Sequence, residues 1–245
     1  LDHAGAVAVG EPCETVHALM QHVAHAQEEW ARGEGLPTLL SHFGVTFVER
    51  ALIDAFCRRH GTPVGEVLRL NGLGVVLGDL HPELSDWEPA QGLSKVTLGR
   101  VASRHTVGLG DPLEEADVIE DERPTDDLPV SLRAVCRHYR LHDFKIKVAG
   151  DPDAALDRLE RVVRLISEET QGKFAASIDG NESFTTMVDF RDFWTKARAR
   201  SGLADFWSRL TYVEQPLHRD HALADEIEAT LQGWPEHPPL LIDES

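Results

Sequence analysis

Apolar side chains follow a helical pattern through the first third of the chain. They recur at intervals of three and four over residues 14–32 and again over residues 47–56. Because this period places apolar side chains on one face of a helix, each segment is predicted to form an amphipathic helix. Glycine and proline residues interrupt the pattern between Gly61 and Pro89, which indicates loop. The first part of the chain is therefore predicted to be mainly helical.

After residue 98 the pattern changes to short β-rich runs separated by helical segments. The predicted strands cover residues 101–109, 144–148, 175–178, 210–213 and 240–242. Predicted helices fill the gaps at residues 131–139, 190–208 and 222–231. Such alternation indicates parallel strands joined by crossover helices. The change divides the chain into two predicted domains, residues 1–98 and residues 99–245.

One crossover helix has clear signals at both ends. Asp151 and Pro152 are typical of an N-cap and a first helical residue, and Gly172 follows the last apolar position. Between them lies a predicted buried stripe of Leu156, Leu159, Val162, Val163 and Ile166.

The composition is that of a soluble globular chain with a strong negative charge. The 245 residues, 42% of them hydrophobic, are enough to bury a substantial core. Twenty-four Lys and Arg against 42 Asp and Glu give a net charge of −18. This charge repels phosphate backbones and anionic lipids, so neither a nucleic-acid nor a membrane-surface role is expected.

Cysteine usage and the absence of targeting patterns favour the cytoplasm. Cys13, Cys57 and Cys136 lie far apart without zinc-finger spacing, which is typical of a reducing compartment. No apolar run approaches the roughly 18 residues that span a bilayer, and residues 1–11 do not follow a signal-peptide pattern. Since Leu1 is not an initiator Met, the first domain is expected to be partly trimmed.

Charged residues stand at the carboxyl ends of four predicted strands: Lys145 and Lys147, then Asp179, Glu214 and Asp243. The intervals from Lys147 onward are 32, 35 and 29 residues, each one strand-and-helix unit. In a (β/α)₈ barrel successive strand ends surround one mouth. Three carboxylates there would repel one another unless a cation neutralised them, and oxygen ligands favour a hard ion such as Mg²⁺.

These residues resemble a known family. Four strings, in their order and spacing, resemble the enolase superfamily, chiefly its muconate-lactonizing and mandelate-racemase branches. They are Lys145-Ile146-Lys147, Ile178-Asp179-Gly180-Asn181, Val213-Glu214-Gln215-Pro216-Leu217 and Ile242-Asp243-Glu244-Ser245. Residues 49–54 with Pro63-Val64 are similar to a helix of its N-terminal domain. The resemblance implies an α/β fold, a (β/α)₈ TIM-type barrel preceded by an α+β capping domain, and often a homo-oligomer.

The resemblance also implies a reaction. Asp179, Glu214 and Asp243 would bind Mg²⁺, with Mn²⁺ as an alternative ion, while Lys147 would be the base and Lys145 its electrostatic support. Such enzymes remove a proton next to a carboxylate and stabilise the enolate with metal. A racemase, epimerase, cycloisomerase or acid-sugar dehydratase acting on a small carboxylate is expected. The alternative is a non-catalytic family member that binds metal and carboxylate, or an inactive barrel fragment.

Two features separate this chain from the family pattern. Gly180 stands where Ala commonly precedes Asn, which mainly affects loop geometry. About 145 residues follow the boundary, enough for five strands, whereas a full barrel takes roughly 250 residues. Strands six to eight, which carry the partner acid or base in the family, are therefore expected to be missing from this chain. Glu244 beside Asp243 is interpreted as a rim residue.

Each selected residue also has a plainer explanation. Lys145 and Lys147 could be solvated strand-edge residues, and Asp179 and Asp243 could be turn or capping residues. The occurrence of all four strings in the family's order favours the predicted metal site over these explanations. Other features rank lower as site candidates. A surface helix explains His17, His22 and His25, and a solvated loop explains the acidic residues 111–127. Gly108-Leu109-Gly110 is too short for a phosphate loop, and Arg104 and His105 are substrate-side candidates near the first strand.

Overall fold

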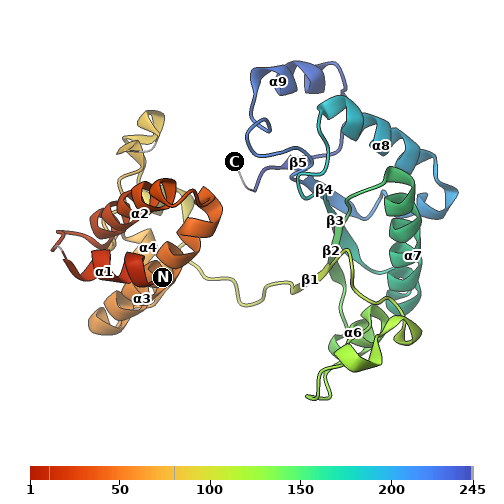
Figure 1. Cartoon of the computed structure of the whole chain (residues 1–245), viewed down its shortest axis with the longest axis horizontal. Coiled ribbons are helices and arrows are strands. Elements are labelled where there is room, and N and C mark those ends of the chain that lie inside the picture. The colour runs from red at the N-terminus through yellow and green to blue at the C-terminus, as the bar shows by residue number, and fades with distance from the viewer. Residues whose placement is uncertain (11, 80, 244–245) are drawn as a thin grey trace. The chain divides into compact units, whose positions relative to one another are not determined.

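The computed structural model describes residues 1–10, 12–79 and 81–243. The chain forms two compact units, Leu1–Arg100 and Val101–Ser245 (Figure 1). None of the helices in the described ranges is both long enough and apolar enough to cross a bilayer.

The first unit is built from helices. They are α1 (Asp2–Gly10), α2 (Val16–Gly33), α3 (Thr38–His60), α4 (Val64–Arg69), α5 (Pro89–Gly92) and two 3-10 turns, η1 (Leu77–Asp79) and η2 (Pro82–Leu84). The core side chains Ala4, Met20, Val23 and Val45 come from α1, α2 and α3. Thr15 caps α2 by accepting the N–H of Ala18.

The expected strands of an α+β capping domain are not found among the described residues of this unit. Every regular element there is helical. The reason lies in the period of the apolar positions, because the buried residues of α2 are Met20, Val23, Gln27 and Ala31, spaced by three or four. That part of the predicted fold is wrong for these residues, whereas the mainly helical character is confirmed.

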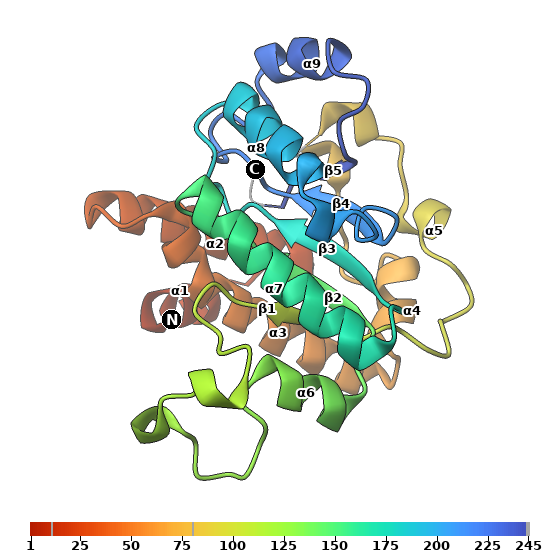
Figure 2. The ribbon, with the colours of Figure 1, turned by 90° about the vertical axis from the view of Figure 1, so that its right-hand side faces the viewer.

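The second unit is an α/β structure with a five-stranded, all-parallel sheet. Its strands are β1 (Arg104–Val107), β2 (Asp143–Lys147), β3 (Ala175–Asp179), β4 (Leu210–Glu214) and β5 (Leu240–Leu241). Its helices are η3 (Glu115–Asp117), η4 (Glu120–Glu122), α6 (Leu132–Tyr139), α7 (Pro152–Thr170), α8 (Met187–Ala199), η5 (Ser201–Leu203) and α9 (Asp225–Gln232). The strands neighbour one another in sequence order. Helices α7 and α8 cover the same face of the sheet (Figure 2).

The predicted alternation of strands and helices is confirmed, with changes at the ends of elements. The first strand is four residues long and begins at Arg104. Helix α8 starts at Met187, three residues before the predicted start, because Thr186 and Asp189 form a capping box. It ends at Ala199, and the remaining predicted helix contains the 3-10 turn η5.

Helix α7 matches its prediction closely. Asp151 accepts hydrogen bonds from the N–H groups of Asp153 and Ala154, and Pro152 is the first helical residue. Gln171 ends the helix with a left-handed φ of 54°. The whole predicted stripe from Leu156 to Ile166 is buried in the main core.

Alternation along β2 separates the core from the polar face of the sheet. Phe144 and Ile146 are buried in the main core. Lys145 and Lys147 alternate with them and therefore project from the opposite face. Because the helix-covered face is apolar, the polar strand residues collect on the other face.

Candidate functional site

Strand pairing brings three of the predicted site residues side by side. Lys147 is the register partner of Asp179, and Asp179 is the register partner of Glu214. Each is the last residue of its strand. The structure therefore places Lys147, Asp179 and Glu214 at adjacent carboxyl ends of one parallel sheet.

Lys145 joins the two carboxylates. Its Nζ lies 3.0 Å from Oδ2 of Asp179 and 2.5 Å from Oε1 of Glu214. Both acidic side chains are only 6% exposed. Burial lowers the pKa of Lys145, but its hydrogen bonds to Glu214 and Asp179 raise it more, so the net pKa lies above the ordinary value. Lys145 is thus held as an ammonium that offsets the two buried negative charges.

Lys147 is the more accessible of the two lysines. Its side chain is 32% exposed against 16% for Lys145. Its Nζ donates a hydrogen bond to Oδ1 of Asn181 and lies 3.8 Å from Oδ2 of Asp179. Only Lys145 bridges both acids, so Lys147 is the lysine better placed to meet a ligand.

One carboxylate oxygen of the cluster, Oε2 of Glu214, differs from the others in its surroundings. Oε2 of Glu214 is buried and accepts no hydrogen bond within the described residues. The Nη2 atom of Arg104 lies 3.9 Å away, within ion-pair range but too far for a hydrogen bond. A buried carboxylate oxygen normally has a partner. The oxygen-only donor set and this orphaned atom fit a hard divalent cation.

Asp243 stands apart from the other two acids. It follows β5 by two residues and is exposed, and its backbone N–H donates to Oε1 of Gln215 at 2.8 Å. Within residues 1–10, 12–79 and 81–243, no three His, Cys, Asp or Glu side chains come close enough together to hold a metal. The structure assembles Asp179 and Glu214 but does not bring the Asp243 carboxylate to them. Glu244 lies outside the described residues.

Arg104, Ser177 and Tyr212 complete the polar face below the strand ends. Arg104 Nη1 donates to Oγ of Ser177 at 3.1 Å and to the Tyr212 hydroxyl, and the guanidinium lies 5.6 Å from the centroid of the tyrosine ring. Sequence reasoning ranked Arg104 low and did not select Ser177 or Tyr212. Their signal is strand alternation, since Ser177 and Tyr212 precede Asp179 and Glu214 by two residues.

His105 does not share this site. It lines a separate cavity of about 370 Å³ with Asp111 and Leu132. Burial lowers the pKa of His105, partly countered by the charge of Asp111. Neighbouring strand residues face opposite sides of a sheet, so the side chains of Arg104 and His105 lie on different faces.

Three of the lower-ranked features, His25, Gly108 and part of the acidic segment, have structural partners. His25 Nε2 lies 3.4 Å from Glu29 on the exposed side of α2. The N–H of Gly108 donates to Oδ2 of Asp111, which makes a turn. Part of the acidic segment forms ion pairs, because Glu114 binds Arg133 and Glu115 binds Arg123.

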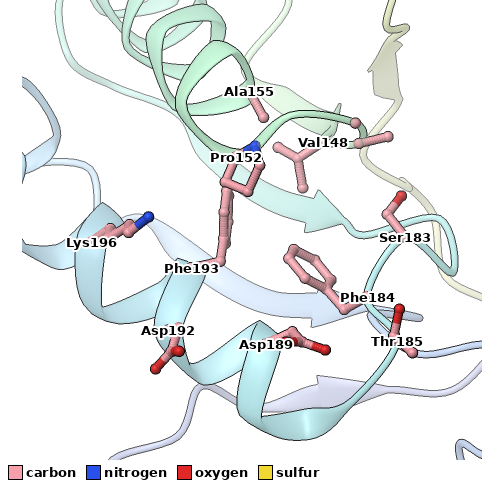
Figure 3. A pocket seen from close by; sticks show the side chains of 12 residues that line it. Val148, Pro152, Ala155, Ser183, Phe184, Thr185, Asp189, Asp192, Phe193 and Lys196 are labelled. Atoms are coloured by element: carbon pink, nitrogen blue, oxygen red, sulfur yellow. The ribbon is translucent and has the colours of Figure 1, made fainter.

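A cavity of about 350 Å³ lies between the first turn of α7 and one side of α8 (Figure 3). Phe184, Phe193 and Lys196 are among its lining residues. Lys145, Lys147, Asp179 and Glu214 are not. The cavity is therefore distinct from the strand-end cluster, and we do not assign the predicted chemistry to it.

No protein-family model matches the chain, and neither a curated protein nor a solved structure matches it.

Proposed function

We propose that the second unit carries a site that removes a proton from the carbon next to a carboxylate, as in the racemases, epimerases, cycloisomerases and acid-sugar dehydratases of the enolase superfamily. One observation carries the proposal: Lys145 bridges Asp179 and Glu214 at adjacent parallel strand ends, with Lys147 beside them. The proposal covers the first step that these reactions share.

The proposal includes a metal and a barrel. Asp179 and Glu214, joined by Asp243, would hold Mg²⁺ or Mn²⁺, which when bound would supply positive charge next to the substrate carboxylate. The strand order supports the barrel, because β1 to β5 follow the chain without reversal and α7 and α8 lie on one face. A doubly wound sheet would reverse its order and place helices on both faces.

Lys147 would be the base. In its unprotonated form, its Nζ would accept the α-proton, so that the C–H bond breaks, an N–H bond forms and the electron pair stays on the substrate. Asn181 Oδ1 would orient the amine, since it already accepts from Nζ. Lys145 would remain an ammonium, because two carboxylates hold its proton.

Solvent exchange tests the proposal. The purified chain would be incubated in D₂O with Mg²⁺ and a panel of small carboxylic acids, and deuterium at the α-carbon would be followed by mass spectrometry. We expect Lys147→Ala to lower incorporation at least about 100-fold, the usual contribution of a general base, with little change in Mg²⁺ affinity. Lys196→Ala removes an exposed lysine from the cavity of Figure 3 and should leave incorporation unchanged. Equal incorporation in the Lys147→Ala variant and the parent would refute the base assignment.

A second candidate is binding of metal and carboxylate without turnover. It is favoured by the contacts of Lys147, whose Nζ hydrogen-bonds Asn181 and lies near Asp179, an arrangement that also suits an ammonium for anion binding. Acids that bind in the presence of Mg²⁺ without taking up deuterium would identify this function.

A further inference from the structure

Gln215 is the residue immediately after Glu214, and it is almost completely buried. Its exposed fraction is 1%. Its backbone has a φ of 36°, in the left-handed region that few non-glycine residues adopt. A buried primary amide requires partners for both its N–H₂ and its oxygen, and strained backbone is found where surrounding contacts fix it.

The hydrogen bonds of Gln215 join the ends of three strands. Its backbone oxygen accepts the N–H of Glu182 beyond β3 at 2.9 Å, and its backbone N–H donates to the oxygen of Leu241 in β5 at 2.9 Å. Its side-chain Oε1 accepts the N–H of Asp243 at 2.8 Å, while Nε2 donates to the oxygen of Leu217 at 2.9 Å. Asp179 and Glu214 are the last residues of β3 and β4, and Asp243 follows β5 by two residues.

We propose that Gln215 is a positioning residue, which fixes the backbone of Asp243 beside the end of β4 and so sets the distance between the fifth-strand acid and Glu214. The left-handed turn at Gln215 sends the chain out of β4 while its side chain reaches back to β5. Asp243 lies beyond the last paired residue of β5, Leu241. The side-chain amide of Gln215 therefore holds the chain next to β4 for two residues beyond the last strand pair. The consequence for metal binding rests on the proposed function, whereas the backbone contact does not.

Three variants separate positioning from general stability. Gln215→Leu keeps a similar volume and removes the side-chain hydrogen bonds to Asp243 and Leu217. Gln27→Leu is the matched control, because Gln27 is 2% exposed and also uses both ends of its amide, toward Ser41 and His3, in the first unit. Gln215→Glu retains an acceptor for the N–H of Asp243 and loses the donor to Leu217.

Amide hydrogen exchange in the metal-free full chain, followed by NMR, measures the contact directly. We expect the amide of Asp243 to exchange roughly tenfold faster in Gln215→Leu, because the hydrogen bond to its acceptor is lost. Gln27→Leu and Gln215→Glu should leave its rate at the parent value. An unchanged rate in Gln215→Leu would overturn the proposal; if that variant does not fold, parent-like exchange in Gln215→Glu supports it and fast exchange there overturns it.

A Mg²⁺ titration by calorimetry gives the second readout. Residues that orient metal ligands typically contribute 10–100-fold to affinity, so we expect a loss of roughly that size in Gln215→Leu and none in Gln27→Leu. Equal losses in both would mean a general stability effect and would overturn the positioning role. A parent chain that binds no Mg²⁺ would refute the metal site of the proposed function, and the exchange rate at Asp243 would then decide the role of Gln215 alone.

Discussion

Gly180 and Pro216 approach so closely that a β-carbon on Gly180 would lie 2.7 Å from Cα of Pro216. The N–H of Gly180 donates to the oxygen of Glu214 at 2.8 Å, which continues the β3–β4 pairing beyond the two acids. The glycine expected to have only a mild effect on loop geometry thus allows two site loops to touch.

Gly180→Ala should therefore destabilise the chain and separate the two acids. We expect a loss of about 1–3 kcal/mol, the usual cost of overpacking, measured by urea unfolding, together with weaker Mg²⁺ binding. Gly110→Ala is the control, because a β-carbon there meets nothing within 4 Å, and should change stability by less than about 0.5 kcal/mol. Parent-like stability of Gly180→Ala would show that the loops can move apart without cost.

Neutralising either clustered acid should weaken metal binding. Asp179→Asn and Glu214→Gln keep the shape of each side chain but remove a negative charge that hard cations prefer. We expect a reduced Mg²⁺ affinity in calorimetric titrations of each variant. Asp192→Asn changes an exposed acid on α8 and should titrate like the parent. Retained affinity in both site variants would rule out the proposed ligands.

The sequence predicts the sheet and its strand-end residues because those signals are local. β-rich runs mark the strands, and Asp151 with Pro152 marks the start of α7. The start of α8 was missed although Thr186 and Asp189 form a readable capping box. The strands of the capping domain were expected only from the family resemblance, and this expectation conflicts with the helical period of the apolar residues in the first unit.

Contacts between distant segments could not be predicted in this way. Arg104 and Tyr212 are 108 residues apart in sequence. They come together because β1, β2, β3 and β4 lie side by side in one sheet. The hydrogen bond from Asp243 to Gln215 spans 28 residues and depends on the left-handed turn after β4. The strand-end positions of Asp179 and Glu214 predicted that the two acids would lie together, but not that Lys145 would bridge them.

Removing Lys145 should leave two buried carboxylates without their shared ammonium. We expect Lys145→Met to lose roughly 3 kcal/mol or more in metal-free buffer, since breaking a buried ion pair leaves uncompensated charge. Added Mg²⁺ should restore more stability to this variant than to the parent, which thermal unfolding with and without Mg²⁺ would measure. Lys173→Met, at an exposed lysine before β3, should behave as the parent does. A Lys145→Met variant as stable as the parent would mean that the acids do not need the ammonium.

The ion pairs of Arg133 should make the stability of the second unit depend on acid pH. Hydrogen bonds from Arg133 lower the pKa of Glu114 below its ordinary value of 4.5, and those from Arg137 and Arg133 lower the pKa of Glu169. Since the folded state binds these protons less readily than the unfolded state, the stabilisation is fully present above about pH 4.5 and is lost as the pH falls through the lowered folded-state values.

Urea unfolding between pH 6 and pH 3 would test this dependence. Arg133→Met should flatten the fall in the unfolding midpoint, because the pKa values of Glu114 and Glu169 then return toward the ordinary value. Arg164→Met removes an exposed arginine from α7 and should keep the slope of the parent. Parallel slopes in the parent and in Arg133→Met would mean that other carboxylates govern acid unfolding, because only groups whose pKa differs between folded and unfolded chains contribute to that slope.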